Sequence, residues 1–274
     1  MPPTRPSASP RTFRSLGPVA LAPLEAVARP VGLLRALRPD DDPIVSWSTV
    51  ATPALVLGRS ARATPIDMRV AERAGVTVVR RTSGGGPVLW DHDLIALDVV
   101  LPPGHPLAPA DVVETYRWLG EAIAGALEAL GAPRVEVVAI ADARHAARAP
   151  GAAADACYGG ISPFEVLVDG RKVVGLSQAR HQPGTLLQAG IVLKLDARLL
   201  SDLMGRDEPF AAALANHAAG LGEWLPAVTA GDLIEAVNTQ IVERGGHSLI
   251  LSDPTTVERA AIVAATREIA LLRT

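Results

Sequence analysis

The sequence predicts an α+β fold, with a mixed and largely antiparallel sheet packed by helices. Residues 162–168 alternate apolar and polar side chains, Asp169-Gly170 is a hairpin dipeptide, and a return strand starts at Lys172. Residues 184–191 follow as a turn and a further strand. A helix is predicted over 111–130, because apolar residues recur there at helical spacing and Gly131 can end it.

The remaining elements complete this architecture. Residues 76–79 form a short β-branched run typical of a strand, and helices are predicted over 211–221, 230–243 and 253–272. We expect residues 1–30 to be a disordered leader, because five prolines precede residue 20 and the first acidic residue is Glu25. Residues 31–205 then form the principal domain, and 206–274 a helical C-terminal extension packed on it.

Composition excludes several classes of protein. A single cysteine in 274 residues cannot form an intramolecular disulfide, and no apolar run reaches the roughly 20 residues that cross a bilayer. A net charge of −3 gives no reason to expect nucleic acid. One cysteine and six scattered histidines show no ligand pair, so we expect no metal site. The sequence predicts a cytoplasmic protein without a membrane partner.

A glycine-rich loop follows the strand predicted at 76–79. Residues 80–86 read RRTSGGG, and three successive glycines leave a backbone that can approach an anion closely with its N–H groups. Glycine triplets alone are most often flexible loops. Here the triplet lies between two predicted strands, beside further hydrogen-bond donors. The loop is therefore a candidate phosphate or carboxylate site, made of Arg80, Arg81, Ser83, Gly84, Gly85 and Gly86.

Cys157 lies fifteen positions before Lys172, by the difference of their numbers. From spacing alone, Lys172 would be a solvated residue at a hairpin end, and Cys157 a small buried hydrophobe. The residues around Cys157 favour another interpretation, because the alanines before it and the glycines after it indicate a tight turn where a nucleophile can be reached. Both residues are candidate catalytic groups.

Four segments together resemble the lipoate-protein ligase and octanoyltransferase superfamily, whose catalytic domain is related to that of biotin ligases. They are residues 53–60 (PALVLGRS), 80–88 (RRTSGGGPV), 170–178 (GRKVVGLSQ) and 184–190 (GTLLQAG). The resemblance covers roughly residues 33–205 and implies a catalytic domain over 31–205. It also implies an essential lysine at Lys172 and substrate or adenylate contacts from Gly175, Gln178 and Gly184.

Two chemistries are implied by this resemblance, and both attach an acyl group to a lysine of a lipoyl domain. A ligase uses ATP with Mg²⁺ and lipoate, so that the glycine loop receives the adenylate phosphate and Lys172 polarises the acyl carbonyl. A transferase needs no cofactor. It takes octanoate from acyl carrier protein onto Cys157 as a thioester, and the ammonium of Lys172 favours the thiolate. The implied acceptors are lipoyl domains of 2-oxoacid dehydrogenase complexes or glycine-cleavage H protein.

The segment 157–166 (CYGGISPFEV) resembles the cysteine loop of the cysteine-dependent octanoyltransferases and favours the second chemistry. Two positions depart from that pattern. Gly86 stands where those transferases usually have an arginine, and Trp90 where a histidine is common, so that the role of the histidine is lost or taken by His92. A more remote alternative is a non-catalytic acyl-binding protein, which retention of both Cys157 and Lys172 argues against.

Overall fold

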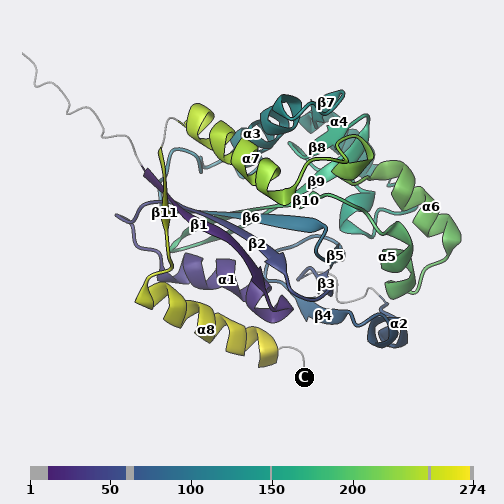
Figure 1. Ribbon diagram of the computed structural model, residues 1–274, viewed down its shortest axis with the longest axis horizontal. Helices are drawn as coiled ribbons and strands as arrows, with labels where there is room; N and C mark the ends of the chain where they lie inside the picture. The colour runs from purple at the N-terminus through teal and green to yellow at the C-terminus, as the bar shows by residue number, and fades with distance from the viewer. Residues whose placement is uncertain (1–11, 60–64, 149, 246–247, 272–274) are drawn as a thin grey trace, which may run out of the picture.

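The computed structural model describes residues 12–59, 65–148, 150–245 and 248–271 (Figure 1). Eleven strands occur in these ranges: β1 Thr12–Leu21, β2 Ile44–Val50, β3 Ala54–Leu57, β4 Thr77–Arg80, β5 Val88–Trp90, β6 Leu94–Leu101, β7 Val135–Val137, β8 Val166–Val168, β9 Arg171–His181, β10 Gly184–Val192 and β11 Ser248–Ser252. The α-helices described are α1 Pro23–Ala36, α2 Met68–Arg73, α3 Arg117–Ala129, α4 Ile140–Arg148, α5 Ala197–Leu203, α6 Glu208–His217, α7 Ala230–Gly245 and α8 Thr256–Leu271. Short 3-10 helices lie at Glu114–Tyr116, Cys157–Gly159 and Leu221–Glu223.

The main sheet has eight strands in the order β11-β1-β2-β6-β10-β9-β8-β7. β1 pairs in parallel with both β11 and β2, and the other neighbouring pairs are antiparallel. The expectation of a mixed, largely antiparallel sheet is therefore confirmed. A second sheet of three strands, in the order β4-β3-β5, carries the segments that lead into and out of the glycine loop.

Helices cover both faces of the main sheet. α1 and α8 pack together on one face, and α3 and α7 lie on the other (Figure 1). Gly32 permits the contact between α1 and α8, since a Cβ at this position would collide with the backbone of Ile262. The glycine loop and the chain around Cys157 lie on the α1 side, next to the three-stranded sheet.

The expected leader is wrong for residues 12–30, which form β1 and the first half of α1, whereas residues 1–11 lie outside the described residues. Two of the prolines occupy positions where the element tolerates them, whereas Pro30 lies inside α1. Pro18 falls at the register shift between β1 and β2, and Pro23 is the first residue of α1, where its missing N–H leaves no partner unsatisfied. Proline count alone was a poor guide to disorder here.

The C-terminal region is not the purely helical extension that we expected. It contributes β11, the edge strand beside β1, and α8, which packs on α1. Upstream of these, the backbone of Lys172 forms a bridge with Ala218, and its carbonyl accepts a hydrogen bond of 3.0 Å from the N–H of Ala219. Residues beyond 205 therefore help to build the site described below.

Several predicted elements are confirmed with shifted bounds. The hairpin at Asp169-Gly170 is present, but its first strand begins at Val166, because Phe164 adopts a φ of 67° that ends regular pairing. The predicted helix at 111–130 starts as the 3-10 turn and becomes α3 at Arg117, while the Asp111 carboxylate accepts the N–H of Val113 at 2.8 Å. Among the described helices, none is long and apolar enough to span a membrane.

Candidate active site

Cys157 lies where two hollows meet. The first, which we call the apolar cavity, lies between α1, β5 and the middle strands of the main sheet, and its lining includes Val27, Pro30, Trp90, Leu94, Tyr158 and Gly190. The second, the polar cleft, is lined by the glycine triplet together with Gly160, Glu165, Lys172 and Gln178. Four residues, Arg81, Cys157, Leu176 and Ser177, line both hollows. A group attached to Cys157 would therefore have an apolar hollow on one side and a polar one on the other.

Lys172 is not the solvated hairpin residue that spacing alone suggested, since it is only 1% exposed. Its ammonium lies 2.7 Å from the Glu165 carboxylate and donates to the carbonyl oxygens of Cys157 at 2.8 Å and Gly160 at 3.0 Å. An ammonium has three donors, and these contacts use all three. Lys172 thus fixes both ends of the short segment that carries the cysteine.

Glu165 is a site residue that our sequence analysis missed. It is 2% exposed and accepts hydrogen bonds from the backbone N–H groups of Ser162 at 2.7 Å and Leu176 at 3.1 Å, besides its ion pair with Lys172. A buried ion pair is tolerated when its geometry is good and the remaining lone pairs are satisfied. The signal in the sequence was a single charged residue between Phe164 and Val166.

Tyr158 places the cysteine segment against the sheet. Its hydroxyl donates to the carbonyl of Gly190 at 2.8 Å, and its ring packs on Gly175. A Cβ at Gly190 would lie 2.9 Å from that hydroxyl, so glycine is needed for this contact. Burial raises the pKa of Tyr158 well above its usual value, which keeps the phenol neutral and able to donate. Gly175, predicted as a contact residue, therefore lies in the apolar cavity beneath Tyr158.

The glycine triplet packs directly against the cysteine segment. A Cβ at Gly86 would collide with the carbonyl of Asp155 and lie 2.8 Å from the amide nitrogen of Cys157. That nitrogen donates to the carbonyl of Pro87 at 3.1 Å. A side chain at position 86 would displace this backbone. The close approach requires glycine at position 86 in this chain, where the resemblance implied an arginine.

The other predicted residues divide between the site and its surroundings. Arg81 turns back onto its own loop and donates to the carbonyl of Gly84 at 2.8 Å, whereas Arg80 points to the carbonyl of Gly58 and lines neither hollow. Gln178 lines the polar cleft and donates to the carbonyl of Val112 at 2.6 Å. Gly184 also lines neither hollow. It starts β10, about 20 Å along the strand from Gly190 at roughly 3.3 Å per residue.

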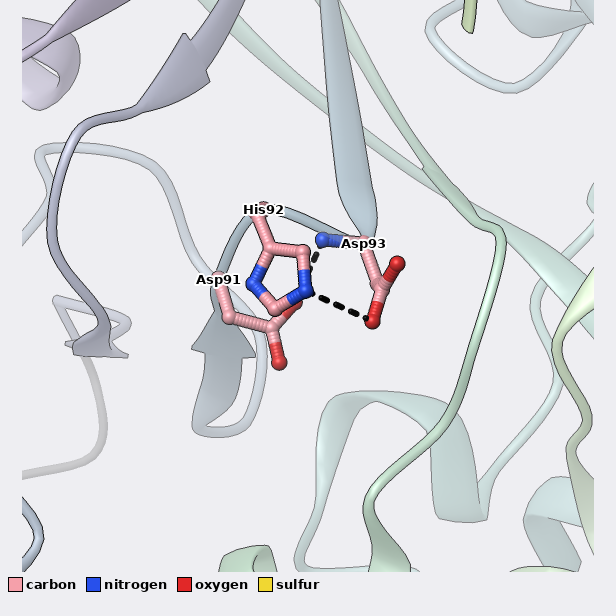
Figure 2. Close-up of side chains that lie close together, drawn as sticks. All are labelled: Asp91, His92 and Asp93. Carbon is pink, nitrogen blue, oxygen red and sulfur yellow. Dashed lines mark hydrogen bonds and ion pairs between the residues drawn. The ribbon is translucent and has the colours of Figure 1, made fainter. Parts of the chain in front are cut away.

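Trp90 lines the apolar cavity, and its indole N–H donates to the carbonyl of Leu94 at 3.1 Å. The side chain of His92 is 82% exposed and lines neither hollow, so His92 does not take the place of a histidine at position 90. Figure 2 shows it in a tight turn, with its Nε2 3.3 Å from Asp93 and the Asp91 carboxylate accepting the N–H of Asp93.

Asp91, His92 and Asp93 are the group of possible metal ligands found within the described residues, with ligand atoms inside 4.8 Å of one another (Figure 2). Their side-chain contacts lie within the turn, and the backbone carbonyl of Asp93 accepts the N–H of Leu193 at 2.6 Å. Burial raises the pKa of Asp91, which works against a charged ligand there. Acidic groups of this kind are common without an ion, and the trio lines neither of the two hollows.

Comparison with known proteins identifies the family. Over residues 22–242 the chain matches the model of the lipoyl protein ligase A/B catalytic domain. The chain belongs to this family. The matched region runs past residue 205, in agreement with the contribution of Ala218 and Ala219 to the backbone of Lys172.

Family members with curated names give a narrower similarity. An octanoyltransferase LipM of an Exiguobacterium species is 34% identical over 168 residues, which are 61% of this chain and 60% of that protein. The Staphylococcus aureus octanoyltransferase LipM is 31% identical over 159 residues, or 57% of this chain and 56% of its own. The match to these relatives thus spans about three fifths of their length or less.

Solved structures of family members share the fold over almost the whole chain. A putative lipoate protein ligase from T. acidophilum with bound lipoic acid has a TM-score of 0.75 at 16% identity, covering 94% of this chain and 95% of that one. A lipoate-protein ligase A bound with ATP has a TM-score of 0.74 at 17% identity, with the same coverage. At these identities the likeness establishes the fold.

Proposed function

We propose that this protein transfers an octanoyl group from acyl carrier protein to the acceptor lysine of a lipoyl domain, through a thioester on Cys157. The observation that carries the proposal is the position of Cys157 at the junction of the apolar cavity and the polar cleft. An apolar chain gains free energy when it leaves water for such a cavity, about 0.8 kcal/mol for each buried CH₂. The names of the curated relatives support octanoyl as the group transferred.

The first half of the reaction acylates the cysteine. The Cys157 thiolate attacks the carbonyl carbon of the carrier thioester, a new C–S bond forms, and the carrier thiolate leaves and takes up a proton. The acyl chain lies in the apolar cavity while the reacting carbonyl remains at the cleft. Lys172 holds the Cys157 segment through its two carbonyl contacts and can stabilise the negative oxygen by exchanging one of them.

The second half passes the acyl group to the acceptor. The amine of the lipoyl-domain lysine enters through the polar cleft, attacks the thioester carbonyl, loses a proton and releases the Cys157 thiolate. Closure of the cleft around the two partners would exclude water, which otherwise hydrolyses the thioester. One solved relative is described as a bi-partite lipoate protein ligase and its E2 lipoyl domain, which supports a lipoyl domain as acceptor here.

A second function is favoured by one observation. The glycine triplet lines the polar cleft, where it could receive the phosphate of an acyl-adenylate formed from ATP with Mg²⁺ and lipoate. In the structure, however, Arg81 donates to the carbonyls of Gly84 and Gly86 in its own loop. Phosphate binding would have to release these contacts, so we favour the transferase, which needs no cofactor.

The test is the intact mass of the purified protein after incubation with octanoyl-acyl carrier protein without ATP, followed by addition of a lipoyl domain. We expect one octanoyl adduct, absent in Cys157→Ala, and its passage to the lipoyl domain. Lipoyl-domain modification that appears only with ATP and free lipoate, and survives in Cys157→Ala, would establish the ligase instead. Ligand binding without modification by either route would leave an acyl-binding protein.

A further inference from the structure

A row of polar side chains crosses the floor of the apolar cavity. In the sheet register Ser177 of β9 lies opposite Gln188 of β10, Gln188 opposite Asp98 of β6, and Asp98 opposite Ser46 of β2. Residues directly opposite one another in a sheet point to the same face. Gln188 and Asp98 both line the apolar cavity. The cavity therefore has a polar band across a largely apolar surface.

In the part of the chain that the structure describes, the hydrogen bonds of this row leave a donor and an acceptor without a partner at the cavity wall. Gln188 donates from Nε2 to Asp98 at 2.8 Å and accepts at Oε1 from the hydroxyl groups of Ser83 at 3.0 Å and Ser177 at 3.4 Å. Within the described residues, the second hydrogen on Gln188 Nε2 and the second oxygen of Asp98 have no hydrogen-bond partner. One donor and one acceptor thus lie side by side in the cavity wall.

Asp98 lies in an unusual environment for a carboxyl group. It is 2% exposed, and its one hydrogen bond comes from a neutral amide. Burial raises its pKa from 3.8 to about 7. A buried guanidinium, that of Arg29, offsets the charge from the α1 side while it donates to Ser46 at 3.1 Å. Asp98 in its charged form is balanced by Arg29, and in its protonated form it is itself neutral, so both forms suit an uncharged ligand group.

The row also gives the depth of the polar band. Ser177 lines both hollows and stands at the mouth, whereas Gln188 and Asp98 line the apolar cavity and not the polar cleft. Neighbouring strands are about 4.8 Å apart, so Asp98 lies about 10 Å from the Ser177 position across the sheet. That distance is comparable to the length of a medium-chain acyl group. A chain held at Cys157 would pass Gln188 near its middle and reach Asp98 in its distal half.

We propose that Asp98 and Gln188 form a subsite for a small, uncharged hydrogen-bonding group, such as a hydroxyl, in the distal half of the acyl chain. The inference rests on the proposed function only in placing the acyl chain in this cavity. A hydroxyl group both donates and accepts, and so can accept from Gln188 and donate to Asp98 at once. An unsubstituted chain would cover both groups without replacing their water, which costs free energy for each buried polar group left unpaired.

The experiment measures binding of unsubstituted octanoate and of octanoates hydroxylated at carbon 5, 6, 7 or 8 to the full chain, by isothermal titration calorimetry. We expect one or two adjacent positions of the hydroxyl to bind about tenfold more tightly than octanoate, as expected for about one additional hydrogen bond. If every hydroxylated acid binds no more tightly than octanoate, the subsite does not exist. This comparison uses the unaltered protein, so it does not depend on whether any variant folds.

Variants separate the subsite from general stability. Asp98→Leu combined with Gln188→Leu should reverse the preference, because the band becomes apolar, and Gln188→Met alone should reduce it. Thr185→Val is a matched control: it is a polar-to-apolar change in β10, at an odd offset that places it on the opposite face from Gln188, and Thr185 lines neither hollow. Its preference should equal that of the unaltered protein. A preference that persists in the Leu variant would contradict the assignment.

Failure of this inference is distinguishable from failure of the proposed function. If Cys157 is acylated and passes octanoate on, but no hydroxylated acid is preferred, the transferase stands and the subsite falls. If hydroxylated acids are preferred while neither Cys157 nor a lipoyl domain is ever acylated, the subsite stands and the transferase falls. The binding measurement does not depend on turnover.

Discussion

The two hollows that meet at Cys157 each contain one buried carboxyl group, and these groups are held in opposite ways. Glu165 in the polar cleft faces an ammonium at 2.7 Å and two backbone N–H groups. Asp98 in the apolar cavity accepts one hydrogen bond from a neutral amide. Both are only 2% exposed. The cleft thus has a saturated charge pair that fixes geometry, whereas the cavity has an unsaturated group that a ligand or a proton can complete.

The largest effect should follow from loss of the ammonium in the cleft. In Lys172→Ala the carbonyls of Cys157 and Gly160 lose their common donor, and the ammonium that would stabilise the negative oxygen of the reaction is lost. We expect transfer to a lipoyl domain to fall about 10³-fold, the upper range for loss of one stabilising donor. Intact mass of the acceptor over time measures this. Near-normal transfer by the variant would remove Lys172 from the site.

The buried ion pair of Glu165 and Lys172 should contribute to the free energy of unfolding. Glu165→Leu leaves the Lys172 ammonium buried without its counter-ion, and we expect the free energy of unfolding to fall by about 3–5 kcal/mol. The double variant Glu165→Leu/Lys172→Met replaces the pair by apolar groups and should recover most of this loss while remaining inactive. Urea unfolding of the three proteins gives the values. A double variant no more stable than Glu165→Leu would argue against a direct interaction between Glu165 and Lys172.

The Asp98 carboxyl group, which has one hydrogen-bond partner among the described residues, should make stability depend on pH. The pKa of Asp98 is raised from 3.8 to about 7, so between these values the folded protein retains a proton that the unfolded chain has lost. Stability must therefore fall as pH rises from about 4 to 7 and then level off. At about 1.4 kcal/mol for each unit the loss is about 4 kcal/mol. The free energy of unfolding of the wild type minus that of Asp98→Asn, measured from pH 4 to 8, isolates the contribution of Asp98. A difference that does not change with pH would contradict a raised pKa of Asp98.

The smallest effect tests the contact that joins the two hollows. Gly86→Ala places a methyl group against the backbone of Asp155 and Cys157, and displacement of the nucleophile should lower acyl transfer about 10²-fold. Gly84→Ala is the matched comparison, because its methyl group meets no atom within 4 Å and should lose far less. Rates of Cys157 acylation decide between them. Equal losses would mean that the triplet acts through flexibility rather than through this contact.

Prediction from the sequence succeeded where a signal is local. The dipeptide Asp169-Gly170 located the hairpin, and the apolar spacing of residues 111–130 located the helix that becomes α3. Prediction failed for residues 12–30, where the prolines suggested disorder. In the structure Pro18 lies at a register shift of β1 and Pro23 at the start of α1. Local propensity carries no information about a strand partner, and β1 is ordered by its pairing with both β2 and β11.

The sequence by itself determined the hairpin at Asp169-Gly170, the glycine loop, the cysteine and the lysine, since each is carried by residue type and short spacing. Only the tertiary structure decided that Lys172 is buried against Glu165, that Arg80 and Gly184 lie outside the hollows, and that Asp98 and Gln188 face the apolar cavity. The physical reason is that pairing of β6, β9 and β10 brings distant residues together. Side-chain burial follows from which strands are neighbours, which no short stretch of sequence specifies.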